Sequence, residues 1–150
     1  MNDISRARMV LMAEDDSDDR LLIKDAMAEC RWDGDLRFVE DGEELLDYLS
    51  HRGRYSPPAD APWPGLILLD LNMPRKDGRE ALREIKADAE LRRIPVVVLT
   101  TSKAGTDIGR VYDLGANSFI TKPIQFEALV NVMRALGQYW FNTVELPAPK

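Results

Sequence analysis

The chain has 150 residues, of which 45% are hydrophobic and 31% are charged, and its formal net charge is -6 at pH 7. This length and composition predict one globular domain that can bury its own core. The negative charge argues against binding to nucleic acid, because the phosphate backbone would be repelled. The single cysteine, Cys30, excludes an intramolecular disulfide framework, and the single histidine, His51, excludes histidine triads and clustered histidine metal sites.

The sequence also argues against membrane insertion and secretion. Its apolar runs fall well short of the ~20 residues that a membrane helix needs. The first apolar run, residues 9–13, leads directly into acidic residues, unlike a signal peptide. Together with the low cysteine content, these features predict a cytoplasmic protein that does not bind a membrane.

The first half of the chain alternates strand and helix patterns. Residues 9–13 are apolar throughout, which predicts a buried strand. Residues 17–30 place apolar side chains at helical spacing, and residues 36–40 alternate as a half-exposed strand does. Asp41 and Glu44 have the spacing of a capping box, so a second helix is expected to begin there.

The middle of the chain continues this alternation after a long connection. Residues 51–65 are rich in proline and predict an ordered surface loop. The apolar residues 66–70 predict a strand at the centre of the sheet, and residues 79–89 predict a helix. Residues 96–100, with Pro95 before them, predict a fourth strand.

The last part predicts a helix over residues 106–114, ended by Gly115, then a strand over 118–121 and a final helix over 124–141. Five βα units in series predict an α/β fold, a doubly wound parallel five-stranded sheet with helices on both faces. We expect a single domain over residues 1–150, with its core at about 8–141. The tail at 142–150 is too short for an output domain.

Charged side chains follow several of the predicted strands. Glu14 and Asp15 follow the first strand and Asp70 follows the third, while Thr100 ends the fourth and Lys122 follows the fifth. The carboxyl ends of parallel strands share one edge of a sheet, which is where ligands bind in such folds. Each feature also has a simpler interpretation: the acidic run as a helix start and Asp70 as a strand-end cap.

Taken together, these residues predict phosphoryl transfer to a carboxylate. Two carboxylates about 4 Å apart repel by roughly 4 kcal/mol at an effective dielectric constant of 20, so three of them favour a bound cation. Oxygen ligands suit Mg²⁺, held by Glu14, Asp15, Asp70 and the backbone carbonyl of Asn72. Asp70 is the predicted nucleophile, because the most buried strand holds it, and Lys122 suits a phosphoryl group.

With these residues in place, the chain resembles the receiver domain of two-component response regulators from about Arg8 to Tyr139. The similar segments are Glu14-Asp15-Asp16, Asp70-Leu71-Asn72-Met73-Pro74 with Asp77-Gly78, Pro95 to Thr101, and Gly115 to Pro123. The resemblance implies a flavodoxin-like receiver fold with strand order 2-1-3-4-5. It also implies a phosphoprotein switch whose only chemistry is its own phosphorylation and dephosphorylation, rather than an enzyme.

The resemblance further implies roles for single residues. Asp70 would accept the phosphoryl group from a phosphohistidine of a sensor histidine kinase, and Lys122 would pair with it. Asp15 would bind Mg²⁺ directly and Glu14 through water, although many members have Asp at the position of Glu14. Thr100 and Phe119 would switch conformation together, with Phe119 standing where Tyr is frequent. The Lys122–Pro123 peptide bond is expected to be cis.

The end of the chain narrows the resemblance to single-domain regulators that partner bacterial phytochromes. Gln138 to Phe141, Val144 to Pro147 and Asp77 to Glu80 carry this similarity. It implies a phytochrome-type kinase as partner and a homodimer formed by the helix at 106–114, the strand at 118–121, the last helix and the tail. Tyr139, Trp140 and Phe141 are the predicted interface aromatics, unless they pack in the core.

Three other functions remain to be weighed. A haloacid-dehalogenase-like Mg²⁺ phosphohydrolase would need a second Asp where Asn72 stands. A receiver-like dimer or docking scaffold would work without phosphorylation. A flavodoxin-like cofactor binder would need glycines where the first βα turn is acidic.

Overall fold

The computed structural model describes residues 8–32, 34–101 and 105–147. The predicted tail at 142–150 and the predicted domain over 1–150 therefore lie partly outside the described residues. It contains one parallel sheet in the order β2-β1-β3-β4-β5, as predicted. The strands are β1 (Val10–Ala13), β2 (Leu36–Val39), β3 (Leu66–Leu69), β4 (Val96–Thr100) and β5 (Ser118–Thr121).

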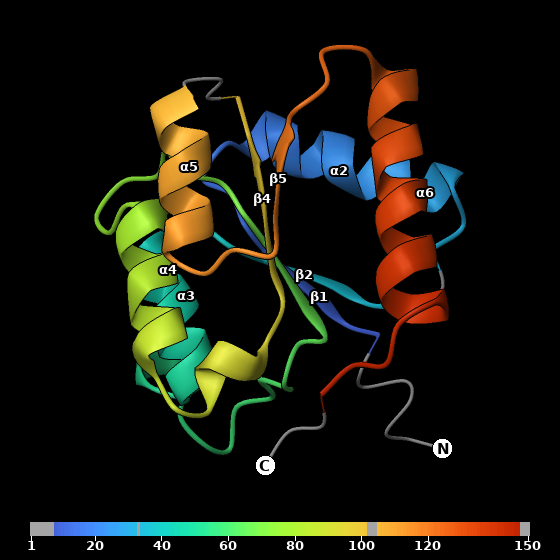
Figure 1. The fold of residues 1–150 in the computed structure, drawn as a ribbon. Coiled ribbons are helices and arrows are strands. Elements are labelled where there is room, and N and C mark those ends of the chain that lie inside the picture. The colour runs from blue at the N-terminus through green and yellow to red at the C-terminus, as the bar shows by residue number, and fades with distance from the viewer. Residues whose placement is uncertain (1–7, 33, 102–104, 148–150) are drawn as a thin grey trace.

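Helices cover both faces of this sheet (Figure 1). On one side lie α3, α4 and α5, and on the other lie α2 and α6, which confirms the doubly wound arrangement. The helices are α2 (Ser17–Glu29), α3 (Gly42–Ser50), α4 (Gly78–Ala87), α5 (Gly105–Asp113) and α6 (Phe126–Asn142), with short 3-10 turns η1 (Gly53–Tyr55) and η2 (Leu91–Arg93). Their ends differ from the predicted ones by one or two residues, as fraying ends do.

Polar side chains begin the helices much as the sequence predicts. Asp41 accepts a hydrogen bond from the backbone N–H of Glu44 at 2.7 Å. The Glu44 carboxylate accepts from the N–H of Glu40, one residue before the cap, so the capping box is shifted by one position. Gly115 ends α5 with φ 106°, a conformation that glycine adopts without strain.

The core lies in two layers, one on each face of the sheet. The side chains of β1, β3 and β4 are fully buried, and they alternate between the two layers. In α2, Ile23, Ala26 and Met27 face the core, but Leu22, whose spacing also predicted burial, is 44% exposed. The helix turns by about 100° per residue, so Leu22 cannot share the face of Ile23 fully.

One backbone prediction is wrong. The Lys122–Pro123 peptide bond is trans, and within the described residues the cis bond is Pro57–Pro58. Trans is the ordinary form even before proline.

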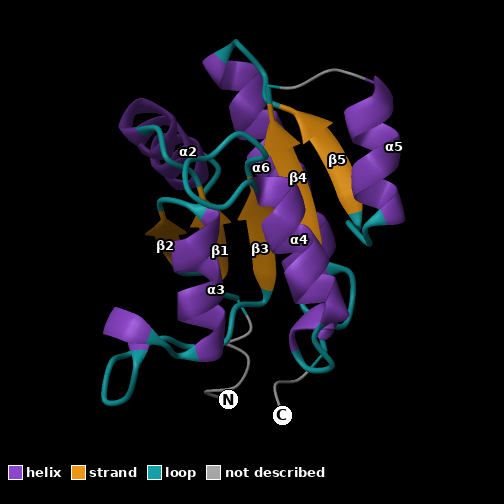
Figure 2. Cartoon of the chain, turned by 90° about the vertical axis from the view of Figure 1, so that its left-hand side faces the viewer, coloured by secondary structure: helices purple, strands orange, loops and turns teal. Residues whose placement is uncertain are grey.

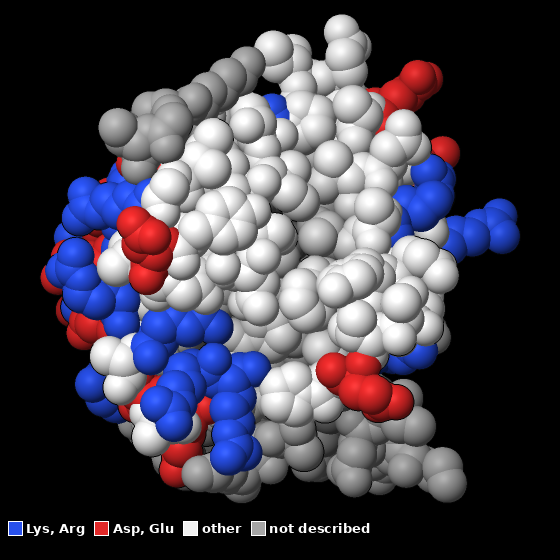
Figure 3. Space-filling model, viewed as in Figure 1, with Lys and Arg blue, Asp and Glu red and all other residues white. Residues whose placement is uncertain are grey.

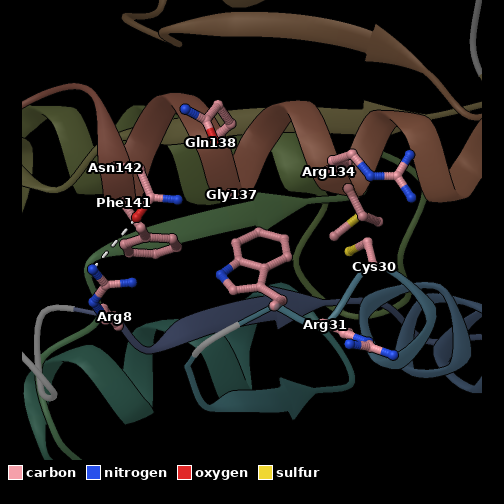
Figure 4. Close-up of a pocket in the computed structure, with 10 residues that line it drawn as sticks. Arg8, Cys30, Arg31, Arg134, Gly137, Gln138, Phe141 and Asn142 are labelled. Carbon is pink, nitrogen blue, oxygen red and sulfur yellow. Dashed lines mark hydrogen bonds between the residues drawn. The ribbon is translucent and has the colours of Figure 1, made fainter.

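Near the starts of the strands, the loop after α2 meets the end of α6 around a cavity of about 200 Å³ (Figure 4). Trp32 packs there against Phe141, with ring centroids 5.5 Å apart. A Cβ on Gly137 would lie 3.3 Å from the indole ring, so the glycine lets helix and ring approach closely. Figure 4 shows Arg31 and Arg134 on the side of the cavity away from Asn142.

Within the described residues, none of the helices has the length and apolar character needed to cross a bilayer.

Candidate functional site

The backbone hydrogen bonds of the sheet place the predicted site residues along one edge. All strands run in the same direction, so their carboxyl ends lie together (Figure 2). The backbone N–H of Glu14 donates to Val39 at 2.9 Å, and that of Asp70 donates to Ala13 at 3.1 Å. The ladder therefore fixes the main chain of these acids although their side chains lie beyond the strands.

Three carboxylates meet at this edge. Oxygens of Glu14, Asp15 and Asp70 all lie within 4.8 Å of one another. Glu14 and Asp70 are 1% and 5% exposed, whereas Asp15 faces solvent. An oxygen-only set with one open side is the kind of donor set that hard divalent cations accept. The arrangement joins the residues that the sequence predicted as metal ligands.

Asp70 is held in place by its neighbours. The fully buried hydroxyl of Thr100 donates to its Oδ1 at 2.8 Å. Burial raises the pKa of Asp70, while Lys122, Thr100 and the backbone N–H of Asn72 oppose that rise. Thr100 thus orients the carboxylate through one oxygen, while burial disfavours its charged form.

Burial disfavours the charged form of Glu14 more strongly still. Burial raises its pKa from 4.5 to about 7, Lys122 opposes the rise, and the charge of Asp70 adds to it. Lys122 therefore does not fully offset the negative charge of the carboxylates, and a cation bound between them would relieve their repulsion.

Lys122 lies at the same edge, and the carboxylates that its ammonium pairs with are those of Glu14 and Asp19. Its backbone N–H donates to Thr100 at 2.8 Å, which sets its place after β5. Its Nζ pairs with Glu14 and, at 3.0 Å, with Asp19. Asp19 was not predicted as part of the site. Its signal is its place in the first turn of α2, directly after the acidic residues that follow β1.

The comparisons with known proteins give the family. Residues 10–134 match the family model described as the response regulator receiver domain. The chain belongs to this family.

Individual receiver proteins are similar over nearly the whole chain. Response regulator Rcp1 of Synechocystis sp. is 39% identical over 141 residues, covering 94% of each protein. The crystal structure of the phosphorylated cyanobacterial phytochrome response regulator RcpA has a TM-score of 0.85 and 41% identity, covering 94% of this chain and 99% of that one. A response regulator in red light signaling of R. palustris has a TM-score of 0.88 and 41% identity, covering 93% and 98%.

These matches place the chain functionally. It is a receiver of a two-component phosphorelay, homologous to phytochrome response regulators, and receivers are generally switches rather than catalysts. They also support a divalent metal in the acidic pocket, because Rcp1 has a crystal structure of its Mn²⁺-bound form (TM-score 0.83, 38% identity, covering 94% and 99%). The comparisons give no support to a phosphohydrolase or a scaffold.

The predicted switch residue Phe119 lies beside the site in this receiver. It is half-buried and packs against the core layer of α3, α4 and α5. Its backbone N–H donates to the hydroxyl of Tyr112 on α5 at 3.2 Å. In the sheet Phe119 pairs with Val98, two residues before Thr100, and its backbone contacts α5.

The three predicted interface aromatics do not share one environment. Tyr139 is 52% exposed and Trp140 is half-buried. Phe141 is 9% exposed and packs on Trp32, so its prediction as an interface residue is wrong. Consecutive helical residues point in different directions, so the three could not all reach one surface.

Proposed function

We propose that this receiver accepts a phosphoryl group from a sensor histidine kinase on Asp70. The convergence of Glu14, Asp15 and Asp70 beside Thr100 and Lys122 carries this proposal. Asp70 lies at the end of the central, fully buried strand, so its position is the most firmly held of the three. We propose that these residues form a single receiver domain, and a cytoplasmic location stays a prediction.

The proposed metal is Mg²⁺, held by Glu14, Asp15, Asp70 and the backbone carbonyl of Asn72. The crowding of carboxylates and the raised pKa of Glu14 support a cation here. When bound, such an ion neutralises charge on the phosphoryl oxygens.

The residues of this chain have separate roles in the transfer. An oxygen of Asp70 bonds to phosphorus as the bond from phosphorus to the histidine nitrogen of the kinase breaks, and that nitrogen keeps the electron pair. Thr100 already donates to Asp70 and is placed to donate to the phosphoryl group. Lys122 must leave Glu14 and Asp19 to pair with it. In dephosphorylation, water attacks phosphorus, the bond from phosphorus to the Asp70 oxygen breaks with its electron pair left on the carboxylate, and inorganic phosphate leaves. The only proposed chemistry is thus self-phosphorylation and dephosphorylation.

The proposed partner is a phytochrome-type sensor kinase. This follows from the similarity to RcpA, which is a phytochrome response regulator. The kinase would present a phosphohistidine to the acidic edge.

We also propose a homodimer through the face of α5, β5 and α6, with the tail contributing. Between α5 and α6 this face is almost without charged residues (Figure 3). Large apolar side chains are exposed on these elements or beside them, at Tyr112, Ile124, Phe126 and Tyr139. Exposed apolar surface of this kind favours an interface.

Phosphoryl uptake from acetyl phosphate tests the proposal. The wild-type protein with Mg²⁺ should gain one phosphoryl group by intact mass, and Asp70→Asn should gain none. Asp18→Asn, which removes an exposed acid from the same acidic run, is the matched control and should be loaded normally. Stoichiometric loading of Asp70→Asn would refute the assignment, and no loading of the wild type would favour a scaffold.

A further inference from the structure

A second buried ion pair lies outside the acidic site. Two salt bridges between described residues join side chains that are both 20% exposed or less. One is the Lys122–Glu14 pair, and the other joins Arg79 on α4 to Asp107 on α5, at 17% and 20%. Partly buried pairs are screened less by water and salt than surface pairs.

The Arg79–Asp107 pair is a two-point contact. Nε of Arg79 donates to Oδ1 of Asp107 at 2.9 Å, and Nη2 donates to Oδ2 at 2.8 Å. Such a fork fixes both distance and orientation, because the planar guanidinium meets the planar carboxylate along one edge. A shift of α5 relative to α4 would therefore strain or break it.

On the α4 side, this contact is tied to the phosphoacceptor loop. The third guanidinium nitrogen, Nη1, donates to Asp77 at 3.0 Å, and the Asp77 carboxylate caps the N–H of Arg79 at 2.8 Å. The next residue, Gly78, lies directly on Asp70: a Cβ there would be 2.3 Å from the Asp70 carbonyl oxygen. The N–H of Gly78 donates to Leu71 at 3.0 Å. A displacement of the backbone at Asp70 would therefore also displace Asp77 and Arg79, because Gly78 lies in close contact with Asp70.

On the α5 side, the ion pair lies at the start of the helix, and contacts with the core come further along it. Val111 is fully buried, and the hydroxyl of Tyr112 accepts from Phe119. A Cβ on Gly109 would meet no atom within 4 Å, so this part of the helix faces open space. Asp107 lies in the first turn of α5, where a carboxylate also suits the helix dipole. The fork therefore attaches the start of α5 to α4.

We propose that Arg79 is a positioning residue that couples the loop after Asp70 to α5 through its fork with Asp107. This rests on the proposed function of Asp70. The coupling carries a change at the acidic edge to the face of α5 and β5 by a route separate from Thr100 and Phe119.

The test compares the response of the two regions to beryllofluoride with Mg²⁺, a mimic of the aspartyl phosphate. Amide chemical shifts of Asp70, Thr100 and Lys122 report on the site. The hydrogen-exchange rate of the Val111 amide, with and without beryllofluoride, reports on α5. In the wild type we expect that rate to change by roughly fivefold or more, the usual size of allosteric coupling.

Arg79→Gln, Asp107→Asn and the double variant should keep the response at the site but lower the Val111 exchange ratio well below its wild-type value, while the contact of Phe119 with Tyr112 remains. The double variant should resemble either single variant, since both remove the same pair. Arg83→Gln, which removes an exposed arginine from the same helix, should behave as the wild type. Thermal unfolding with an unchanged midpoint would show that the variants remain folded.

The outcomes separate this inference from the proposed function. If the wild type shows no response at Asp70, Thr100 and Lys122, the proposed function fails. If the site responds but the Val111 exchange ratio is one in the wild type, or is the same in Arg79→Gln, the coupling through Arg79 is refuted while the site stands.

Discussion

The two ends of the sheet bury different kinds of groups. At the carboxyl end, Glu14, Asp70 and Thr100 are almost completely buried, and the pKa of both acids is raised by burial. At the amino end, the buried contacts are aromatic and close-packed, as between Trp32 and Phe141. Burying a charge destabilises the folded state, whereas burying aromatic surface stabilises it.

This difference assigns the two ends different tasks. The carboxyl end keeps an electrostatic conflict that a cation or a phosphoryl group can resolve, so it responds to ligands. The amino end holds the last helix against the sheet through aromatic packing. Substitutions at the two ends should therefore separate function from stability.

The largest effect on stability is expected at the amino end. Trp32→Ala should lower the free energy of unfolding by about 3 kcal/mol, because it removes a large side chain packed on Phe141 and Gly137. Urea denaturation measures this, and phosphoryl uptake of the folded variant should be unchanged. The exposed Tyr139→Ala on the same helix is the control, with a change within about 0.5 kcal/mol. A similar loss in both variants would contradict the comparison.

The carboxyl end should instead gain stability from its metal. Mg²⁺ at about 100 times its dissociation constant should raise the free energy of unfolding by about 2.7 kcal/mol. Asp15→Asn should lose most of this gain and keep the metal-free stability, because Asp15 is exposed. Urea midpoints with Mg²⁺ and with a chelator give both values. Asp18→Asn should retain the gain, and an equal gain in Asp15→Asn would argue against Asp15 as a ligand.

Removing a buried charge at the carboxyl end should stabilise the metal-free protein. The raised pKa of Asp70 means that its proton stabilises the fold at low pH and that this contribution is lost as pH rises through the folded-state pKa. At neutral pH, Asp70→Asn should therefore be more stable than the wild type, because it removes a charge that burial disfavours. Its amide oxygen can still accept from Thr100. With Mg²⁺ the order should reverse, and a less stable variant under metal-free conditions would contradict the electrostatic argument.

The fold and the placement of the site residues were largely predictable, because both follow from the order of the elements. Purely apolar strands give a parallel sheet, and a parallel sheet brings Glu14, Asp70, Thr100 and Lys122 to one edge wherever the loops go. Only side-chain identity at the strand ends was needed for this step.

What could not be predicted depends on side-chain direction. The pairing of Lys122 with Asp19 depends on how a long side chain turns at the sheet edge. The Arg79–Asp107 fork joins residues 28 positions apart on different helices, and no local pattern marks it. The burial of Phe141 was within reach, because three consecutive helical residues cannot face one surface.

The smallest effect is expected from pH at the amino end. Tyr48 on α3 is buried there and donates to the carbonyl of Pro62 at 2.8 Å. Burial raises its pKa from 10.0 to about 12. Its contribution to stability is thus fully present below about pH 10 and is lost as pH rises through 12. Tyr48→Phe should cost about 1 kcal/mol at pH 8, from the lost hydrogen bond, and this difference should shrink as pH rises above 10. Urea midpoints from pH 8 to 11 measure it, with Tyr139→Phe as the exposed control. A difference that stays constant with pH would show that the Tyr48 hydroxyl titrates alike in the folded and unfolded chains.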